Sequence, residues 1–400
     1  MSSEPNYNRT IRACFVAYII QAIVNNFISL LFVIYQKDYG MPLSEITLLI
    51  TINFTLQLCI DSASALFIDK IGYRASVLIA HATSTLGLIM LAFLPDIMPS
   101  HFIGLLIAVS VYAIGGGLIE VLISPIVEAC PTDNKASAMS LLHSFYNWGS
   151  AGVIIFTTLF LRVFGGESWK VLAIIWAIIP FVNGLIFTRV PIAPLVKDER
   201  GGMKIKELFK CKIFWVFALM MMCSGASEHA VGQWASTIAE KGLNISKTLG
   251  DLTGPALFAI MQGVARLTYA KYGEKYRLDK LMLSSALLCI SSYLLLILSG
   301  NPIFSLVGMA ITGFAVGIMW PGTFSLSSAK LERGGTAMFA LLALFGDMGC
   351  SAGPTVAGFV ANSANDNLKL GIAASLFFPL LMASLLLYLV KEAKKGNAQH

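Results

Sequence analysis

Long apolar runs alternate with short polar segments along the whole chain. Each run has about 20 residues or more, which is the length a helix needs to cross the hydrocarbon core of a bilayer. The pattern therefore predicts an all-α polytopic membrane protein. Its twelve predicted transmembrane helices lie at about 11–36, 43–67, 75–95, 101–129, 136–163, 168–190, 212–240, 250–271, 279–299, 302–328, 335–362 and 369–390.

One connection between the apolar runs is longer and more polar than the others. It joins the sixth and seventh runs and is rich in lysine and arginine. Because it separates six predicted helices from six others, it marks a domain boundary. We expect an N-terminal six-helix bundle at 1–190, a cytoplasmic linker at 191–212 and a C-terminal six-helix bundle at 213–400.

The composition agrees with a lipid environment. Hydrophobic residues make up 56% of the 400 residues and charged residues 12%, about half the roughly 25% of a soluble domain. The net charge of +6 does not indicate nucleic-acid binding, because the basic residues lie between apolar runs rather than on one water-exposed face. The seven cysteines show no spacing typical of a zinc site or a disulfide framework. We expect no cofactor and no metal.

The distribution of lysine and arginine predicts the orientation. If the N-terminus is cytoplasmic, one face of the membrane collects 21 of the 28 basic residues and the other face six, while Arg266 stays inside a predicted helix. Basic residues in short loops favour the cytoplasmic side. We therefore expect a multi-pass protein of the cell membrane with both termini in the cytoplasm.

The loop between the second and third predicted helices reads Asp69-Lys70-Ile71-Gly72-Tyr73-Arg74. Six plus six helices with this D-x-x-G-x-R loop resemble the major facilitator superfamily. Glycine permits a tight reversal there, and an acid at a helix end can meet a helix N-terminus or a basic partner. The resemblance implies a latch that favours one membrane-facing state, formed by Asp69, Gly72 and Arg74. The loop after the eighth predicted helix, at 271–277, lacks the matching acid.

Three further segments resemble the fucose permease branch of that superfamily. They are 115–125, with Glu120 five residues before Pro125, the Trp-Pro segment at 317–326, and the Asn25-Asn26 pair. The resemblance implies two bundles with alternating access to a site at mid-membrane, sugar transport coupled to protons, and Glu120 as the coupling acid. Ser29 stands where that branch carries another acid, so its coupling scheme does not transfer intact.

Polar residues inside the predicted helices indicate a shared cavity. Side chains four positions apart lie on one helix face, and polar or ionisable residues at mid-membrane face a bundle interior or a wet cavity. Some of the amides can instead link helices, at about 1 kcal/mol each. The candidates for substrate binding are Gln21, Asn25, Asn53, Gln57, Glu120, His143, Asn147, Glu228, Gln233, Trp234 and Trp320.

Four acids inside the spans are the candidates for cation coupling. Burial away from water disfavours the charged form of a carboxyl group, so a buried acid can exchange a proton or bind a cation. Glu120 leads because it alone occupies the motif position, and the alternatives are Glu228, Asp347 and Asp61. Proton and sodium both remain possible coupling ions. For Arg266, structural pairing is favoured over binding of an anion.

These residues predict a secondary active transporter of a small neutral polar solute, with a monosaccharide as first choice. An exporter of amphiphilic compounds is the alternative within transport, because Met220, Met221 and Met222 are adjacent. A sensor without transport, or an intramembrane enzyme using His143 or Glu228 as base, is the alternative outside it. No catalytic motif is found, so we expect no enzyme. The expected partners are the substrate, a proton or sodium ion and the lipid bilayer, with the chain as a monomer.

Glycines in the eleventh predicted helix indicate close helix packing. Gly349, Gly353 and Gly358 surround Pro354, which resembles the G-x-x-x-G-P packing element of the superfamily, and Gly149 with Gly152 is a weaker counterpart. Small residues let helix backbones approach closely.

Overall fold

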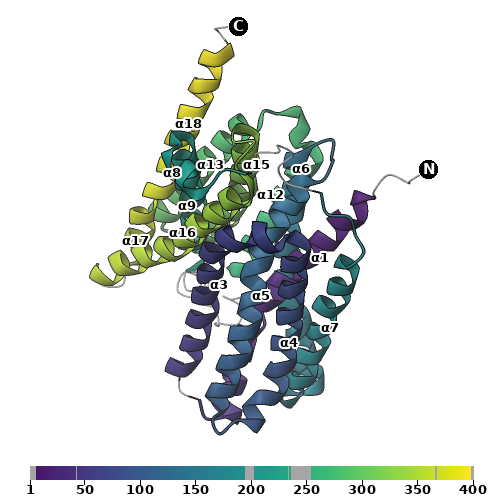
Figure 1. Ribbon diagram of the computed structural model, residues 1–400. Coiled ribbons are helices and arrows are strands. Elements are labelled where there is room, and N and C mark those ends of the chain that lie inside the picture. The colour runs from purple at the N-terminus through teal and green to yellow at the C-terminus, as the bar shows by residue number, and fades with distance from the viewer. Residues whose placement is uncertain are drawn as a thin grey trace, which may run out of the picture. The chain divides into compact units, whose positions relative to one another are not determined.

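The computed structural model describes residues 6–41, 43–193, 202–232, 234–235, 254–364 and 367–397. Every regular element within these ranges is a helix (Figure 1). Ten of the described helical segments are long and apolar enough to cross a membrane. The helices α3 (Leu43–Ile71) and α12 (Pro255–Tyr272) supply the other two predicted spans, with 29 and 18 residues. The predicted all-α polytopic fold is confirmed.

The chain divides into two compact units, of which the first contains Met1–Asp133, Phe145–Gly202 and Gly335–Ala340. Within it, α5 packs against α1, α3 and α4, and α7 packs against α1 and α4; Figure 1 shows α3, α5 and α4 side by side. Its helices are α1 (Tyr7–Asn26), η1 (Ile28–Leu31), α2 (Phe32–Asp38), α3, α4 (Tyr73–Ile97), α5 (His101–Ala129), most of α6 (Lys135–Phe164), η2 (Gly166–Ser168) and α7 (Trp169–Phe187).

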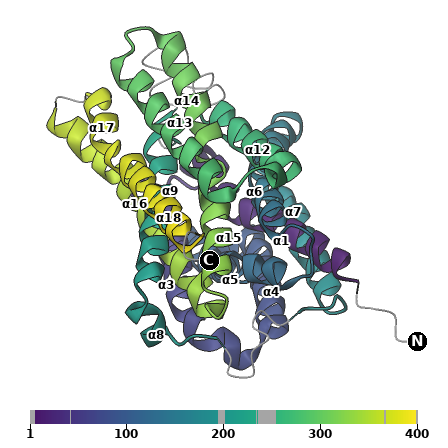
Figure 2. The same cartoon turned by 90° about the horizontal axis from the view of Figure 1, so that it is seen from above.

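The second unit contains Asn134–Ser144, Met203–Gly334 and Leu341–His400. In it α13 packs against α14 and α18, and α9 packs against α15 and α18; Figure 2 shows α13 and α14 as neighbours. Its helices are α8 (Ile205–Lys210), α9 (Lys212–Gly232), α12, η3 (Gly273–Lys275), α13 (Leu278–Leu298), α14 (Pro302–Val316), α15 (Met319–Lys330), most of α16 (Gly335–Ser363), α17 (Leu368–Ser375) and α18 (Phe377–Asn397). The bundle boundaries expected from the sequence remain a prediction.

Helix α7 shows how the helices meet lipid. Val171, Ile178 and Leu185 follow one another at seven-residue intervals and are 58%, 54% and 54% exposed. Leu172 and Phe187 on the other side of the helix are fully buried. A continuous exposed apolar stripe is costly in water and suits a hydrocarbon solvent.

The tenth predicted span, 302–328, is not one helix, because α14 ends at Val316 and α15 begins at Met319. Pro321 has no N–H to donate to the carbonyl of Gly317, four residues earlier. Arg266 Nε donates to that carbonyl oxygen at 2.8 Å instead. The break therefore follows from the proline, and the arginine satisfies the acceptor that the proline leaves.

Two other predicted spans are also interrupted. The first consists of α1, η1 and α2, and the twelfth is divided between α17 and α18. In the twelfth span Pro379 cannot donate to the carbonyl of Ser375, the last residue of α17. Hydropathy alone shows none of these interruptions, because the apolar run continues through each of them.

Candidate functional site

Three consecutive glycines, Gly115–Gly117, place the candidate site in the first unit. A Cβ added to Gly115 would lie 2.2 Å from Ser84 Oγ in α4. A Cβ added to Gly116 would lie 2.9 Å from Val24 Cγ1 in α1, and one added to Gly117 would lie 3.0 Å from Ile60 Cβ in α3. Non-bonded carbon atoms prefer about 3.5–4.0 Å. The glycines thus let three helices approach α5 at one level, within two turns of Glu120.

The side chain of Glu120 lies among polar groups from α1 and α3. Gln21 Nε2 donates a hydrogen bond to Glu120 Oε2 at 2.7 Å. A carboxylate oxygen of Asp61 lies within 4.8 Å of one from Glu120, and Asp61 is fully buried. One turn along α5, Ser124 Oγ and Tyr18 OH are hydrogen-bonded at 2.8 Å. Two of the four predicted coupling acids are therefore neighbours in the first unit.

A second chain of hydrogen bonds joins α3, α1 and α6. Gln57 Nε2 donates to Asn25 Oδ1 at 2.9 Å, and Asn25 Nδ2 donates to Tyr146 OH at 3.3 Å. Asn53 lies one turn before Gln57 and is 1% exposed, and Asn147 follows Tyr146 and is 5% exposed. The stripes predicted for the first two spans do converge, because α1 and α3 both pack on the glycine-rich face of α5.

The sequence did not single out Tyr146. Its position beside Asn147, inside a predicted span, is the only signal that the sequence offers, and an aromatic residue there is more often a packing residue. Its hydroxyl accepts from Asn25, so the polar group at the end of the ring belongs to the site. Buried tyrosines usually place their hydroxyl against a hydrogen-bond partner.

Arg266 organises the predicted site residues of the second unit. Its Nη1 donates to the carbonyl of His143 at 2.9 Å, and its Nη2 lies 3.9 Å from Glu228 Oε2. The His143 ring is stacked on Phe324 with centroids 6.0 Å apart. Glu228 thus lies near a fixed cation, and the carbonyl contacts support the structural role for Arg266.

Asp347 is a residue of α16, and the predicted tryptophans, Trp320 in α15 and Trp234 after α9, both contact that helix. A Cβ on Gly346 would be 2.3 Å from the ring of Trp320, so this ring packs directly on α16 beside Asp347. Trp234 Nε1 donates to the carbonyl of Pro354 at 3.4 Å. Gln233 lies outside the described residues.

The comparison with known families decides the class of protein. The sequence model of the Major Facilitator Superfamily matches residues 14–354. The chain belongs to this superfamily. It is therefore a multi-pass membrane transporter, as the twelve-span pattern and the loop motif predicted. No curated protein sequence matches the chain.

Solved structures show the superfamily fold. The fucose:proton symporter of E. coli matches with a TM-score of 0.81 at 14% identity, covering 95% of this chain and 98% of that chain. A proton:xylose symporter matches with 0.77 at 12% identity, covering 96% and 94%. A human organic anion transporter matches with 0.71 at 16% identity, covering 96% and 100%. At these identities the likeness establishes the fold.

The superfamily loop motif is tied to the end of α7. Gly72 has φ of +85°, which glycine adopts readily, and separates α3 from α4. Arg74 donates to the carbonyls of Phe187, Thr188 and Val190 at 2.7, 3.0 and 2.9 Å. It thus caps orphan carbonyls at the C-terminus of α7. The side chain of Asp69 lies outside the described residues, so the latch remains a prediction.

Proposed function

We propose that this transporter carries a small neutral polar solute, with monosaccharides as the substrate class, by cation-coupled alternating access. The observation that supports it is the hydrogen-bonded set Gln21–Glu120 and Gln57–Asn25–Tyr146 in the first unit. Amide, carboxyl and phenol groups offer both donors and acceptors without a net positive charge. The two similar structures described as sugar:proton symporters support the same substrate class.

Two buried acceptors favour a ligand that donates hydrogen bonds. Gln21 Oε1 and Asn53 Oδ1 are shielded from solvent and have no hydrogen-bond partner among the described residues. A buried polar atom without a partner costs about 1–3 kcal/mol. Sugar hydroxyls would supply donors to such atoms when the helices rearrange around a substrate.

The pair Asp61 and Glu120 supports cation coupling. Two ionised carboxylates within 4.8 Å of each other repel strongly, so the pair is most stable when it shares a proton or holds a cation. Sodium, which prefers oxygen ligands, is the alternative to a proton. We propose Glu120 as the leading coupling residue, with Glu228 and Asp347 as the alternatives.

The export of amphiphilic compounds receives less support. That function predicts a cavity lined by methionine, but Met220 and Met221 are both 0% exposed in the core of the second unit. These side chains fill space between helices, as methionine does in many cores. Export of amphiphilic compounds therefore remains the alternative hypothesis, which the transport assay tests.

Counterflow in proteoliposomes tests the proposed function. The purified chain should exchange a labelled monosaccharide across the bilayer, and a panel of amphiphilic compounds should not compete with it. Exchange of the amphiphiles without sugar exchange would favour the exporter. Absence of all exchange would favour a sensor or an enzyme.

The amide residues of the first unit are expected to bind the substrate. Gln57→Ala and Asn147→Ala should each weaken sugar binding about fivefold or more, because each lost hydrogen bond contributes on the order of 1 kcal/mol. The measurement is half-saturation in the counterflow assay, at equal expression. Gln36→Ala is the matched control, since this glutamine is exposed in α2. Unchanged affinity in both site variants would make these residues links between helices.

We also propose that both termini lie in the cytoplasm, in the cell membrane, with the bundles at 1–190 and 213–400 and the chain as a monomer. A single cysteine beside Lys204, just before α8, should react only with a reagent on the cytoplasmic side. A cysteine beside Lys241, outside the described residues, should react only from the opposite side. Labelling of the Lys204 site from outside would reverse the orientation.

A further inference from the structure

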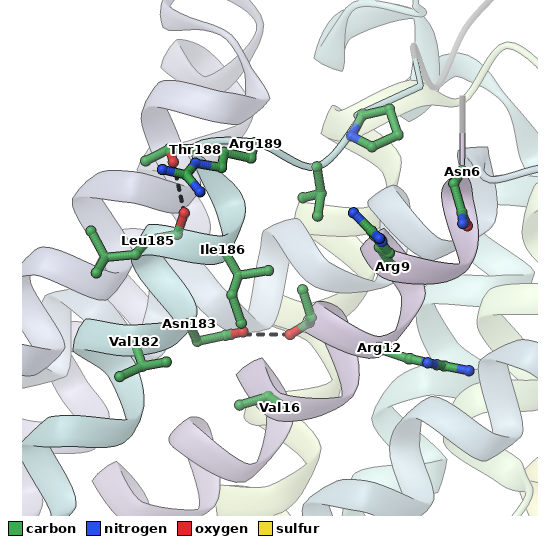
Figure 3. A pocket seen from close by; sticks show the side chains of 13 residues that line it. Asn6, Arg9, Arg12, Val16, Val182, Asn183, Leu185, Ile186, Thr188 and Arg189 are labelled. Atoms are coloured by element: carbon green, nitrogen blue, oxygen red, sulfur yellow. Dashed lines mark hydrogen bonds between the residues drawn. The ribbon is translucent and has the colours of Figure 1, made fainter. Parts of the chain in front are cut away.

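A cleft of about 1110 Å³ lies in the first unit between the beginning of α1 and the end of α7. Figure 3 shows the side chains that line it, with Asn6 just before α1, Arg9 and Arg12 on α1, and Arg189 just beyond α7. The transport site described above uses none of these residues. Asn183 Nδ2 in α7 donates to the carbonyl of Ala13 in α1 at 3.0 Å and joins the two helices beneath the cleft.

The cleft is strongly basic. Three of its lining residues are arginines, Arg9, Arg12 and Arg189, and none of its lining residues is acidic. Among the described residues no hydrogen-bond or ion-pair partner is found for these three guanidinium groups, and all three side chains are exposed. Arginine presents a planar set of donors that matches the oxygens of a phosphate.

The helix ends at the cleft do not oppose an anion. The C-terminus of a helix carries a partial negative charge, which would repel a phosphate near Arg189. At the end of α7, however, Arg74 donates to three carbonyls, including that of Val190, and Thr10 Oγ1 donates to the carbonyl of Pro191 at 2.6 Å. The beginning of α1 adds the favourable end of its own dipole.

The same cleft has an apolar side that continues along α7. Val182, Leu185 and Ile186 line it and are 46%, 54% and 42% exposed. They continue the exposed apolar stripe that begins at Val171, one helix face that meets lipid along its length. Basic groups at a helix end above an exposed apolar stripe match a ligand with an anionic head and hydrocarbon tails.

We propose that this cleft binds an anionic phospholipid. The headgroup phosphate pairs with Arg9, which points toward α7 in Figure 3, and the exposed side chains of Arg12 and Arg189 turn toward it when the lipid binds. An acyl chain runs along Val182, Leu185 and Ile186. Basic pockets between transmembrane helices are a recurrent way of holding anionic headgroups. Because the lipid bridges α1 and α7, it holds the two ends of the first unit together at the membrane surface.

Lipid titration of the full chain in detergent tests the proposal. The probe is dioleoyl phosphatidylglycerol, and bound lipid is counted by native mass spectrometry. Each of Arg9→Gln, Arg12→Gln and Arg189→Gln should weaken binding about fivefold, and the triple variant about a hundredfold. Arg162→Gln is the matched control, because this arginine is exposed in the last turn of α6, outside the cleft. It should bind as the parent does.

Three results would overturn the proposal. One is a triple variant, folded by its thermal unfolding midpoint, that binds phosphatidylglycerol as tightly as the parent. Another is equal binding of dioleoyl phosphatidylcholine, because recognition would then rest on the acyl chains alone. The third is equally tight binding of glycerol phosphate, because the occupant would then be a free anion. If the triple variant does not fold, the single variants are measured instead, and binding of phosphatidylglycerol by all three as tight as in the parent would overturn the proposal.

Discussion

The Glu120→Gln variant is expected to lose accumulation driven by a pH or sodium gradient while it retains counterflow. Glutamine keeps the shape of the side chain and a hydrogen-bonding oxygen toward Gln21, so substrate exchange can continue. It cannot take up and release a proton, and it has no negative charge to hold a cation. The coupling between ion and substrate is therefore lost, while the pathway for the substrate remains.

The expected size follows from the gradient. A pH difference of one unit carries about 1.36 kcal/mol per proton, which supports up to about tenfold accumulation with one proton per substrate. Uptake into proteoliposomes should thus fall from about tenfold to equal concentrations. Glu167→Gln is the matched control, since Glu167 is an exposed acid of η2. Accumulation by Glu120→Gln equal to that of the parent would remove Glu120 from the mechanism.

The second large effect is expected at the contact between α9 and α16. A Cβ on Gly349 would lie 2.0 Å from the carbonyl oxygen of Met222, and one on Gly353 would lie 2.3 Å from that of Ala226. In both cases the obstacle is backbone, which cannot turn aside as a side chain can. Gly349→Ala and Gly353→Ala must therefore push the two helices apart.

Overpacking of this kind typically costs about 1–3 kcal/mol. We expect each alanine variant to lower the thermal unfolding midpoint in detergent by about 2–12 °C, because 1 kcal/mol shifts the midpoint of a domain of this size by about 2–4 °C. Gly152→Ala is the control, because nothing lies within 4 Å of a Cβ added to this residue of α6. Alanine has a higher helix propensity than glycine, so this variant should not lower the midpoint. An unchanged midpoint for Gly349→Ala would show that the helices do not meet this closely.

The sequence predicted the helices well because lipid imposes a simple rule. A span must bring about 20 apolar residues, and polar residues four apart must share a face. These two rules are enough to place the spans and to bring Gln21, Asn25 and Gln57 to one region. The family resemblance singles out Glu120 as the leading candidate for cation coupling, which stays a prediction.

The sequence could not predict contacts that depend on distant parts of the chain. Arg266 satisfies a carbonyl freed by Pro321, and neither residue indicates the other in sequence. The arginines of the cleft follow the same rule, because Arg12 and Arg189 look like ordinary basic residues at the ends of two predicted spans until α1 and α7 are packed together. Gly152 is a case in which the sequence indicated a contact that the structure lacks. The G-x-x-G spacing indicated close helix packing at both Gly149 and Gly152, but only Gly149 lies close to a neighbouring helix.

The three glycines of α5 fix more than the distances between helices. Successive residues of an α-helix point about 100° apart, and each of the three points at a different neighbour. Turning α5 about its own axis would therefore drive a bulkier residue into α1, α3 or α4. Close packing at the three glycines therefore fixes the rotation of α5 about its own axis. The direction in which Glu120 points is thus set by residues without a side chain. The orientation of this acid therefore depends on three positions whose residues have no functional group of their own.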